Sequence, residues 1–358
     1  LKVCQALTQI GEQVHLYVPG SGDVDVDALN RSYGIDIHFP VTRLPSRKIL
    51  RRFDFTWQSL RSARRAGVDL IYTRMLWVAC LAQLKGLPVI LEMHDLPTGR
   101  FGPWLYKEFI RSTRHKLVVY ITRALKRLLD ERSGCAAAPA ECVIAPDGVD
   151  LERYSAMPTP AEARARLHLP ESITAAYSGS FYAGRGLESL LELAVQFPQV
   201  QFLWIGGDEP GVADWQRKLS AAGVGNVRLT GFIPNSQLPL YHAAADILLI
   251  PYSRKVAGSG GGDISAVSSP LKMFEYLAAG RAILSSDLPV LREVLNDSNA
   301  LFYPPEDMHE MSTAFGSLVK EEEQRVRLSK QARQDAGQYE WKARMTTVMQ
   351  AYRDSLSS

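Results

Sequence analysis

Short apolar runs typical of strands alternate with helical patterns along the whole chain, and this alternation restricts the fold more than any other feature. In the first half the runs lie at residues 13–18, 35–41, 69–73, 88–94, 117–121 and 142–146. In the second half they lie at residues 174–178, 201–205, 227–230, 246–251, 282–286 and 301–303. Continuous apolar strands between helices indicate parallel sheets that are covered on both faces. We predict an α/β fold of two doubly wound, Rossmann-like domains with a cleft between them, where ligands bind beyond the carboxyl ends of the strands.

Length and prolines divide this pattern into domains. A chain of 358 residues is long enough for about two domains, and Pro158, Pro160 and Pro170 interrupt the charged stretch between the two series of strands. We expect the first domain over residues 1–155 and the second from residue 156. Because a helix pattern at 2–10 stands where a strand and a tight loop usually begin such a domain, we expect that this strand and loop are missing or abbreviated.

Composition excludes several classes of protein. Apolar residues make up 46% of the chain, yet no apolar run approaches the roughly 18 residues of a membrane span. No signal-peptide pattern opens the sequence, and the four cysteines lack metal-ligand spacing. We therefore predict a cytoplasmic protein with free thiols. A net charge of +3 without a recognition motif argues against binding to nucleic acid.

Positive charge is concentrated between Arg43 and Arg65. Eight basic residues accompany a single acid there, Asp54, with three aromatic residues among them, Phe53, Phe55 and Trp57. Such a stretch can lie on the inner, anionic face of a membrane or meet a phosphorylated acceptor. A solvated helix face with its aromatic residues in the core explains the pattern equally well. Peripheral membrane contact through this stretch is therefore a hypothesis.

Residues 269–280 predict a helix that begins beside a glycine-rich loop at 257–263. Ser269 is expected as the N-cap, Pro270 as the first helical residue and Gly280 as the residue that ends the helix. Unpaired N–H groups in the loop and at the helix start attract phosphate. We expect an anion site at this helix start.

Two charged side chains of the same helix extend that prediction. Lys272 adds a full positive charge, and Glu275 projects from the same face three residues later. A carboxylate beside phosphates is useful where it holds the two hydroxyls of a ribose, so the pair predicts a nucleoside diphosphate. Taken alone, a surface Lys–Glu pair on an ordinary capped helix would explain these residues.

Candidate ligand-binding residues lie at or just after the ends of three other predicted strands. The strand at 174–178 runs into Gly179 and Ser180, where small residues allow close approach, and Arg185 could grip phosphate oxygens. The backbone at 231–233 follows another strand and could pair with the edge of a base. His94 ends the strand at 88–94, where it could donate to a sugar hydroxyl or simply satisfy a local turn.

An ordered series of motifs resembles glycosyltransferase family 4. It comprises PDGVD at 146–150, YSGS at 177–180 with Arg185, FLWIGG at 202–207, GFIP at 231–234, AAADILLIP at 243–251, SPLKMFEY at 269–276 and YEW at 339–341. The resemblance implies a GT-B fold and transfer of a sugar from a UDP- or GDP-sugar to a saccharide or lipid-linked acceptor, with retention of configuration. It implies no metal ion or other cofactor. It also implies a second domain over 156–337 and a final helix over 338–358 that crosses back to the first domain.

The resemblance assigns roles by position. Glu275 would hold the ribose, and Arg185, Lys272 and the amides near Leu271 would lie at the phosphates. Gly231, Phe232 and Ile233 would lie at the base, and His94 at the donor sugar. Gly179 and Ser180 belong to the strand end beside the phosphates.

This sequence departs from the family pattern at three places. Val267 stands where many members have a first glutamate, so we expect Asp263 or loop amides to contact the donor sugar instead. Ser180 replaces a phosphate-binding arginine, which leaves more of that role to Arg185. The N-terminal glycine loop near the acceptor and the diphosphate is absent.

Two other functions remain open from the sequence. A nucleotide-sugar 2-epimerase shares the architecture but needs acidic residues around the sugar, and near His94 the sequence places only Glu92 and Asp95. A non-catalytic nucleotide-sugar-binding protein would explain Val267, Ser180 and the absent loop. An NAD enzyme is disfavoured because no G-x-G-x-x-G turn follows a strand.

Overall fold

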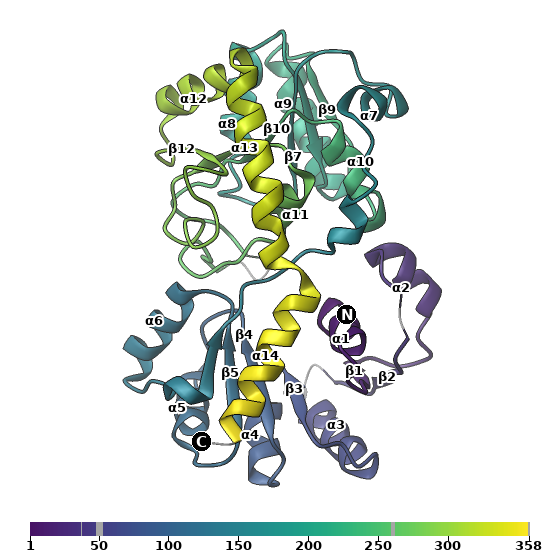
Figure 1. Ribbon diagram of the computed structural model, residues 1–358, viewed down its shortest axis with the longest axis vertical. Coiled ribbons are helices and arrows are strands. Elements are labelled where there is room, and N and C mark those ends of the chain that lie inside the picture. Colours follow the sequence, from purple (N-terminus) through teal and green to yellow (C-terminus); the bar gives the residue numbers. More distant parts are fainter. Residues whose placement is uncertain (37, 48–52, 259–261, 357–358) are drawn as a thin grey trace. The chain divides into compact units, whose positions relative to one another are not determined.

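The computed structural model describes residues 1–36, 38–47, 53–258 and 262–356 and forms two α/β units (Figure 1). The first unit comprises Leu1–Asn30, Ile35–Asp147 and Trp341–Ser358, which pack mainly against one another. The second unit comprises Arg31–Gly34 and Gly148–Glu340. The first unit is therefore discontinuous in sequence, because its last helix follows the whole second unit.

The first unit is built on a four-stranded parallel sheet in the order β3-β4-β5-β6. Its strands are β3 (Ile71–Thr73), β4 (Val89–Met93), β5 (Lys116–Tyr120) and β6 (Cys142–Ile144), each within a range predicted from the sequence or one residue beyond it. Every residue of β4 and β5 is buried, as continuous apolar strands require. A separate parallel pair consists of β1 (Leu16–Pro19) and β2 (Val41–Leu44).

The strand predicted at 35–41 is wrong. Strand β2 begins at Val41, where the predicted strand ends, and residue 37 lies outside the described residues. Ile35 and Phe39 are instead buried in a small cluster with Leu16, Leu29 and other residues. Their apolar character therefore reflects packing of an irregular segment, which periodicity alone does not distinguish from a strand.

Helices complete the first unit: α1 (Lys2–Gln9), α2 (Val26–Tyr33), α3 (Phe53–Arg65), α4 (Leu76–Leu84), α5 (Gly102–Arg111), α6 (Arg123–Ser133) and α14 (Trp341–Leu356). The end of α2, from Arg31, belongs to the second unit. Helix α14, yellow in Figure 1, packs on α1 and on the sheet. Met345 and Val348 of α14 share a buried cluster with Ile90 and Leu117 of the strands. The two chain ends thus cover one face of the same sheet.

The second unit contains a six-stranded parallel sheet in the order β12-β11-β10-β7-β8-β9. The strands are β7 (Thr174–Ser178), β8 (Gln201–Ile205), β9 (Val227–Leu229), β10 (Ile247–Ile250), β11 (Ala282–Ser286) and β12 (Leu301–Tyr303). Alternate residues enter two cores, so that Leu203 and Leu248 face one layer while Phe202 and Trp204 face the other. Strand order reverses between β7 and β10, and doubly wound sheets bind ligands at the carboxyl ends of strands at such a reversal.

The helices of the second unit are α7 (Pro160–Arg166), α8 (Leu187–Gln196), α9 (Glu209–Ala221), α10 (Leu238–Ala243), α11 (Leu271–Ala279), α12 (Met308–Lys320) and α13 (Glu322–Asp335). Short 3₁₀ turns lie at Pro139–Glu141 in the first unit and at Leu151–Tyr154, Asn235–Gln237 and Ala336–Tyr339 in the second. No helix within the described part of the chain is long and apolar enough to cross a membrane.

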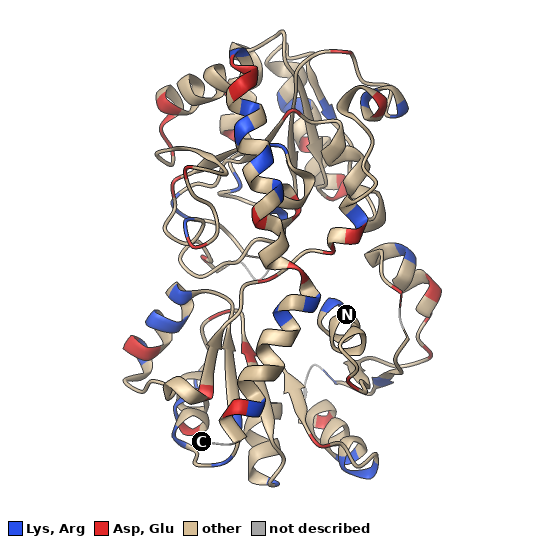
Figure 2. Cartoon of the chain, in the orientation of Figure 1, with Lys and Arg blue, Asp and Glu red and all other residues tan. Residues whose placement is uncertain are grey.

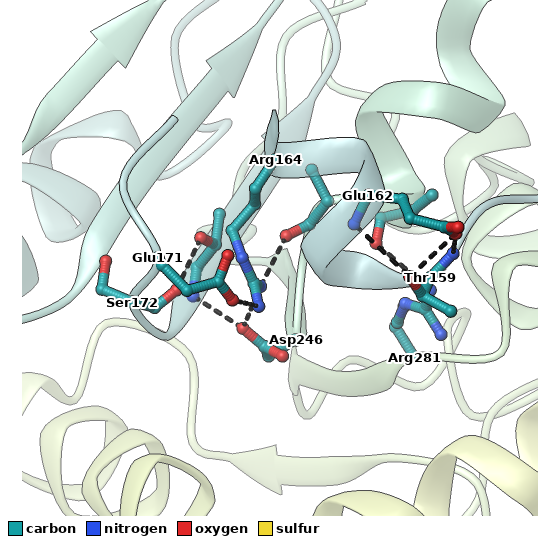
Figure 3. Close-up of polar contacts among 10 residues, drawn as sticks. Thr159, Glu162, Arg164, Glu171, Ser172, Asp246 and Arg281 are labelled. Atoms are coloured by element: carbon teal, nitrogen blue, oxygen red, sulfur yellow. Dashed lines mark hydrogen bonds and ion pairs between the residues drawn. The ribbon is translucent and has the colours of Figure 1, made fainter. Parts of the chain in front are cut away.

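A polar cluster around the buried Arg164 fixes the amino ends of β7 and β10 (Figure 3). Arg164 of α7 donates to Asp246 at 3.0 Å and to Glu171 at 2.8 Å. Asp246 also accepts the N–H of Thr174, the first residue of β7, at 2.8 Å. The cluster therefore joins the two central strands at the edge of the sheet opposite to their carboxyl ends, which leaves the carboxyl edge available for a ligand.

Candidate functional site

The turn after β7 brings the backbone against a lysine of α11. Gly179 has a φ of +144°, and a Cβ atom at this position would lie 2.7 Å from Nζ of Lys272. Because only glycine tolerates both this backbone conformation and this approach, Gly179 allows the lysine to reach the carboxyl end of β7.

Lys272 is a buried cation that has no hydrogen-bond partner in the described part of the chain. Its residue is 8% exposed, and Nζ lies 3.8 Å from the ring centroid of Tyr177 and 5.2 Å from that of Tyr252. Among the residues that the structure describes, Nζ has no hydrogen-bond acceptor. Burial and the nearby Arg185 lower the pKa of Lys272 well below its usual value, although Glu275 acts against them. An ammonium group in this position is suited to receive an anion.

Arg185 supplies a second cation at the same place. Its guanidinium donates to the hydroxyl of Tyr252 at 2.6 Å and to the carbonyl of Ala257 at 3.3 Å. Its buried Nε has no partner within the described ranges. Tyr252 follows β10 and Gly179 follows β7, so both cations lie at the reversal of strand order in the second unit. Gly179, Arg185 and Lys272, predicted separately from the sequence, are thus brought together.

Helix α11 begins one residue later than predicted. Pro270, with φ −69° and ψ 122°, is extended and caps the helix, so neither Ser269 as the N-cap nor Pro270 as the first helical residue is correct. Leu271 opens the helix and is 49% exposed. Gly280, with φ +58°, ends the helix as predicted. The first N–H groups of a helix lack partners within the helix, so the start of α11 adds donors beside Lys272.

Glu275 lies one turn into α11. It is half-buried, and its charge raises the pKa of Lys272 and of the buried Tyr154 and Tyr276. The Glu275 carboxylate is therefore close enough to Lys272 for their charges to interact, and its residue remains partly accessible to solvent.

Asp263, in the glycine-rich loop, is exposed, in contrast to the buried Lys272. Residues 259–261 lie outside the described residues. Asp263 is exposed, and its Oδ1 accepts the N–H groups of Val256 at 3.1 Å and Ser265 at 2.9 Å. These hydrogen bonds lower the pKa of Asp263. One carboxylate oxygen is thus engaged in shaping the loop, while Val267 is buried in the core.

The other predicted residues of the second unit surround the turns after β7 and β9. Ser180 is half-buried, and its carbonyl accepts the hydroxyl of Tyr177 at 2.7 Å. The carbonyl of Gly231 accepts the N–H of Gly206 at 2.9 Å. Phe232 is 76% exposed and Ile233 is half-buried. A groove beside this turn is lined by Gly207, Asp208, Glu209, Val212, Ala213, Gln216, Leu229, Thr230, Gly231 and Phe232.

His94 belongs to the first unit, directly after β4. Its Nε2 contacts the carboxylate of Glu92, which is completely buried and also binds Arg74 at 2.8 Å and Arg344 at 3.0 Å. Asp147 is buried nearby, and burial raises its pKa while the charges of His94 and Arg344 act in the opposite direction.

Sequence reasoning missed part of this environment. It placed Asp95 with Glu92 as the acids near His94. Asp95 is instead exposed, and its Oδ1 accepts the N–H of Leu96 at 2.7 Å. The second buried acid is Asp147, and the balancing cations are Arg74 and Arg344. In the second unit sequence reasoning assigned no role to Tyr177, the last residue but one of β7, or to Tyr252, two residues after β10. Their position near the carboxyl ends of strands is the signal that could have identified them.

Comparisons with known proteins agree with this architecture. Residues 1–153 match the family described as Glycosyltransferase Family 4, and residues 159–335 match the family described as Glycosyl transferases group 1. Together the two matches cover almost the whole chain. The protein belongs to glycosyltransferase family 4, has a GT-B fold and is a glycosyltransferase.

Two curated relatives match most of this chain. Phosphatidyl-myo-inositol mannosyltransferase from Mycolicibacterium smegmatis is 24% identical over 98% of this chain and 88% of its own length. The 2-deoxystreptamine glucosyltransferase from Streptomyces kanamyceticus is 26% identical over 76% of this chain and 79% of its own.

Solved structures share the fold at lower identity. Sucrose-phosphate synthase from Thermosynechococcus elongatus has a TM-score of 0.76 and 20% identity, covering 99% of this chain and 92% of its own. HepE from Anabaena, solved with UDP, has a TM-score of 0.77 and 14% identity, covering 98% of this chain and 95% of its own.

Proposed function

We propose that this glycosyltransferase takes a sugar from a nucleoside diphosphate sugar and transfers it, with retention of configuration, to a saccharide or lipid-linked acceptor in the synthesis of a cell-surface glycan. The observation that carries the proposal is the pair of cations Lys272 and Arg185, both with buried nitrogen atoms that lack acceptors among the described residues. A diphosphate would supply those acceptors, since charge-assisted hydrogen bonds to phosphate are among the strongest in proteins.

Each predicted residue receives a role in this proposal. Lys272, Arg185 and the amides at Leu271 bind the diphosphate, with Gly179 and Ser180 forming the turn beside it. Glu275 binds the ribose, the turn at 231–233 with Phe232 and Ile233 receives the base, and Asp263 or its loop contacts the sugar. His94 acts on the donor sugar.

Retention and independence from metal ions also belong to the proposal. As the diphosphate leaves, the charges of Lys272 and Arg185 and the dipole of α11 offset its developing negative charge. The leaving oxygen then takes the proton of the acceptor hydroxyl, which attacks on the same face of the sugar. Turnover that persists in excess EDTA and a product with the donor's anomeric configuration are the expected results.

Thermal unfolding with UDP, GDP and ADP tests donor recognition directly. The relatives named as a mannosyltransferase and a glucosyltransferase and the UDP complex of HepE motivate this panel. We expect a selective increase in Tm that Glu275→Ala reduces, followed by nucleotide release from the matching nucleotide sugar only when an acceptor is present. A changed sugar without acceptor would indicate an epimerase, and selective binding without turnover of any acceptor would contradict a transferase role.

A basic surface of the first unit supports contact with an anionic membrane surface. Arg61, Arg64 and Arg65 of α3 line a groove with Trp57, which is 56% exposed, and Lys85 lies 4.5 Å above the Trp57 ring. Basic residues occupy the end of α3 in Figure 2. Phe55 is instead a core residue, and Lys48, Arg51 and Arg52 lie outside the described residues. We propose that this groove holds the enzyme at the cytoplasmic face of a membrane.

Vesicle co-sedimentation tests the membrane proposal. Binding to vesicles with phosphatidylglycerol, but not to pure phosphatidylcholine, should be lost when Arg61, Arg64 and Arg65 are changed to Glu. The control reverses two exposed charges of α13 in the second unit, Arg327 and Lys330. Equal binding by both variants, or binding that ignores the anionic lipid, would contradict the proposal.

A further inference from the structure

The buried carboxylate of Glu92 connects His94 to two arginines of the first unit. The Glu92 side chain is 0% exposed, whereas that of His94 is 27% exposed. Oε1 contacts Nε2 of His94 and lies 2.8 Å from Arg74, while Oε2 contacts the hydroxyl of Tyr72 and lies 3.0 Å from Arg344. Both oxygens therefore accept from two donors, and His94 is the only one of these partners whose ring carries a second polar atom.

The surroundings keep Glu92 ionised. Burial alone would raise its pKa, but the hydrogen bond from His94 and the charges of Arg344 and Arg74 hold the pKa well below its usual value. Arg344 is itself fixed, since it also donates to the carbonyls of Pro146 at 2.6 Å and Ala145 at 3.0 Å. An ionised carboxylate can only accept hydrogen bonds, so the His94 nitrogen that faces it must carry a proton.

We infer that Glu92 is a positioning residue that holds His94 as the Nε2–H tautomer and leaves Nδ1 to face the reacting sugar. Nδ1 has no hydrogen-bond partner among the residues that the structure describes. A carboxylate that fixes the tautomer of a working histidine has a large effect on rate in enzymes that use one. The inference rests on the proposed role of His94 in turnover, but the tautomer itself is measurable without turnover.

The titratable groups around the Glu92–His94 pair come from several elements, and the charges of the Leu1 amine and of Cys4 in α1 also act with Glu92. Tyr72 lies on β3 and Arg74 follows it, Glu92 lies on β4, Asp147 follows β6, and Arg344 lies on α14. Replacing Glu92 by Gln removes one negative charge and adds an amide that can donate to a bare Nε2. Glu92→Gln should therefore shift His94 toward the Nδ1–H tautomer and place a proton where the wild type has an open acceptor.

The experiment combines nitrogen NMR with kinetics on the full chain. Protein labelled with ¹⁵N-histidine reports which ring nitrogen carries the proton, and His94→Ala identifies the His94 signals. The matched control is Glu141→Gln, because Glu141 also pairs with a buried cation of the same sheet, Lys116, at 2.9 Å. Kinetics use release of UDP or GDP from UDP-glucose and GDP-mannose, each tested with a panel of acceptors.

The expected result is an Nε2–H tautomer in the wild type and in Glu141→Gln, with a change of tautomer in Glu92→Gln. We also expect kcat of Glu92→Gln to fall at least about tenfold, with KM for the donor changed less than about twofold. An Nδ1–H tautomer in the wild type, or one unaffected by Glu92→Gln, would overturn the inference. So would equal losses of kcat in Glu92→Gln and Glu141→Gln. Full turnover by His94→Ala would instead overturn the proposed role of His94, while leaving the measured tautomer intact.

Discussion

Replacing Lys272 by Met should make the ligand-free protein more stable and should weaken its binding of the proposed donor. The ammonium is buried, lies against the Tyr177 ring and has no acceptor within the described residues. Burying an unpaired ion costs several kcal/mol in real proteins, and a desolvated cation–π contact returns up to about 2 kcal/mol. Methionine fills a similar volume without a charge, so we expect the ligand-free variant to be more stable by about 1–3 kcal/mol.

The same substitution should weaken binding of the proposed nucleoside diphosphate. A hydrogen bond to a charged group contributes about 1.5–3 kcal/mol, which corresponds to roughly 10- to 100-fold in affinity. At a UDP or GDP concentration of about 100 times the wild-type Kd, the ligand stabilises the wild type by about 2.7 kcal/mol. The variant, at only about 1–10 times its own Kd, would gain about 0.4–1.4 kcal/mol.

Thermal unfolding with and without nucleotide measures both effects in one assay. A change of 1 kcal/mol corresponds to roughly 2–4 °C in Tm for a unit of this size. The matched control is Lys218→Met, because Lys218 also lies over a ring, 4.2 Å from the centroid of Trp215, but is about half exposed. The control should change Tm little and retain the full nucleotide shift. A Lys272→Met variant that is less stable than the wild type and keeps the full shift would refute the reasoning.

The remaining predictions concern pH, backbone and catalysis. Because burial depresses the pKa of Lys272 in the folded state, the unfolded chain binds more protons between that depressed pKa and about 10.4, so this lysine makes the ligand-free protein more stable as pH rises through that window. The stability advantage of Lys272→Met should therefore shrink in urea titrations toward pH 10, and a constant advantage would contradict the assignment. Gly186→Ala would place a Cβ 1.8 Å from the carbonyl oxygen of Pro251 and should cost well over the roughly 1–2 kcal/mol expected for Gly223→Ala, where φ is +67° but no described residue lies within 4 Å. Equal Tm losses would argue against this close approach. Glu275→Ala should abolish nucleotide release from the donor while its circular dichroism spectrum stays native, and unchanged turnover would exclude Glu275 from the site.

Much of the fold could be predicted because the strands are buried on both faces. Strands β7, β8 and β11 begin and end where the apolar runs at 174–178, 201–205 and 282–286 do. The prediction failed at β2, where Ile35 and Phe39 are buried without forming a strand. It failed by one residue at α11, since Pro270 suits both the cap and the first helical position, and its ψ angle decides between them.

The candidate site could be predicted only where its residues are close in sequence. Gly179 and Arg185 follow one strand, and Lys272 and Glu275 share one helix, so local patterns identified them. The partners that give these groups their chemistry are remote: Arg185 meets Tyr252, and Glu92 meets Arg344, 252 residues away. Neither pairing leaves a periodicity or a spacing that a single sequence reveals, because both arise from how separate elements pack.

The position of α14 in the chain has a consequence for synthesis on the ribosome. Helix α14 covers Ile90, Leu117 and Val119 of the first unit, and it carries Arg344. The second unit consists of Gly148–Glu340 and Arg31–Gly34, a short segment that includes the end of α2, so all of it is synthesised before α14. Domains generally fold in the order of their synthesis. Here, however, the first unit cannot complete its fold until α14 is made, because one apolar face of its sheet stays exposed and Glu92 lacks Arg344 until then. Nascent chains that stall before residue 341 would therefore expose apolar surface that chaperones bind. In these chains Glu92, the partner of His94, would lack its contact with Arg344.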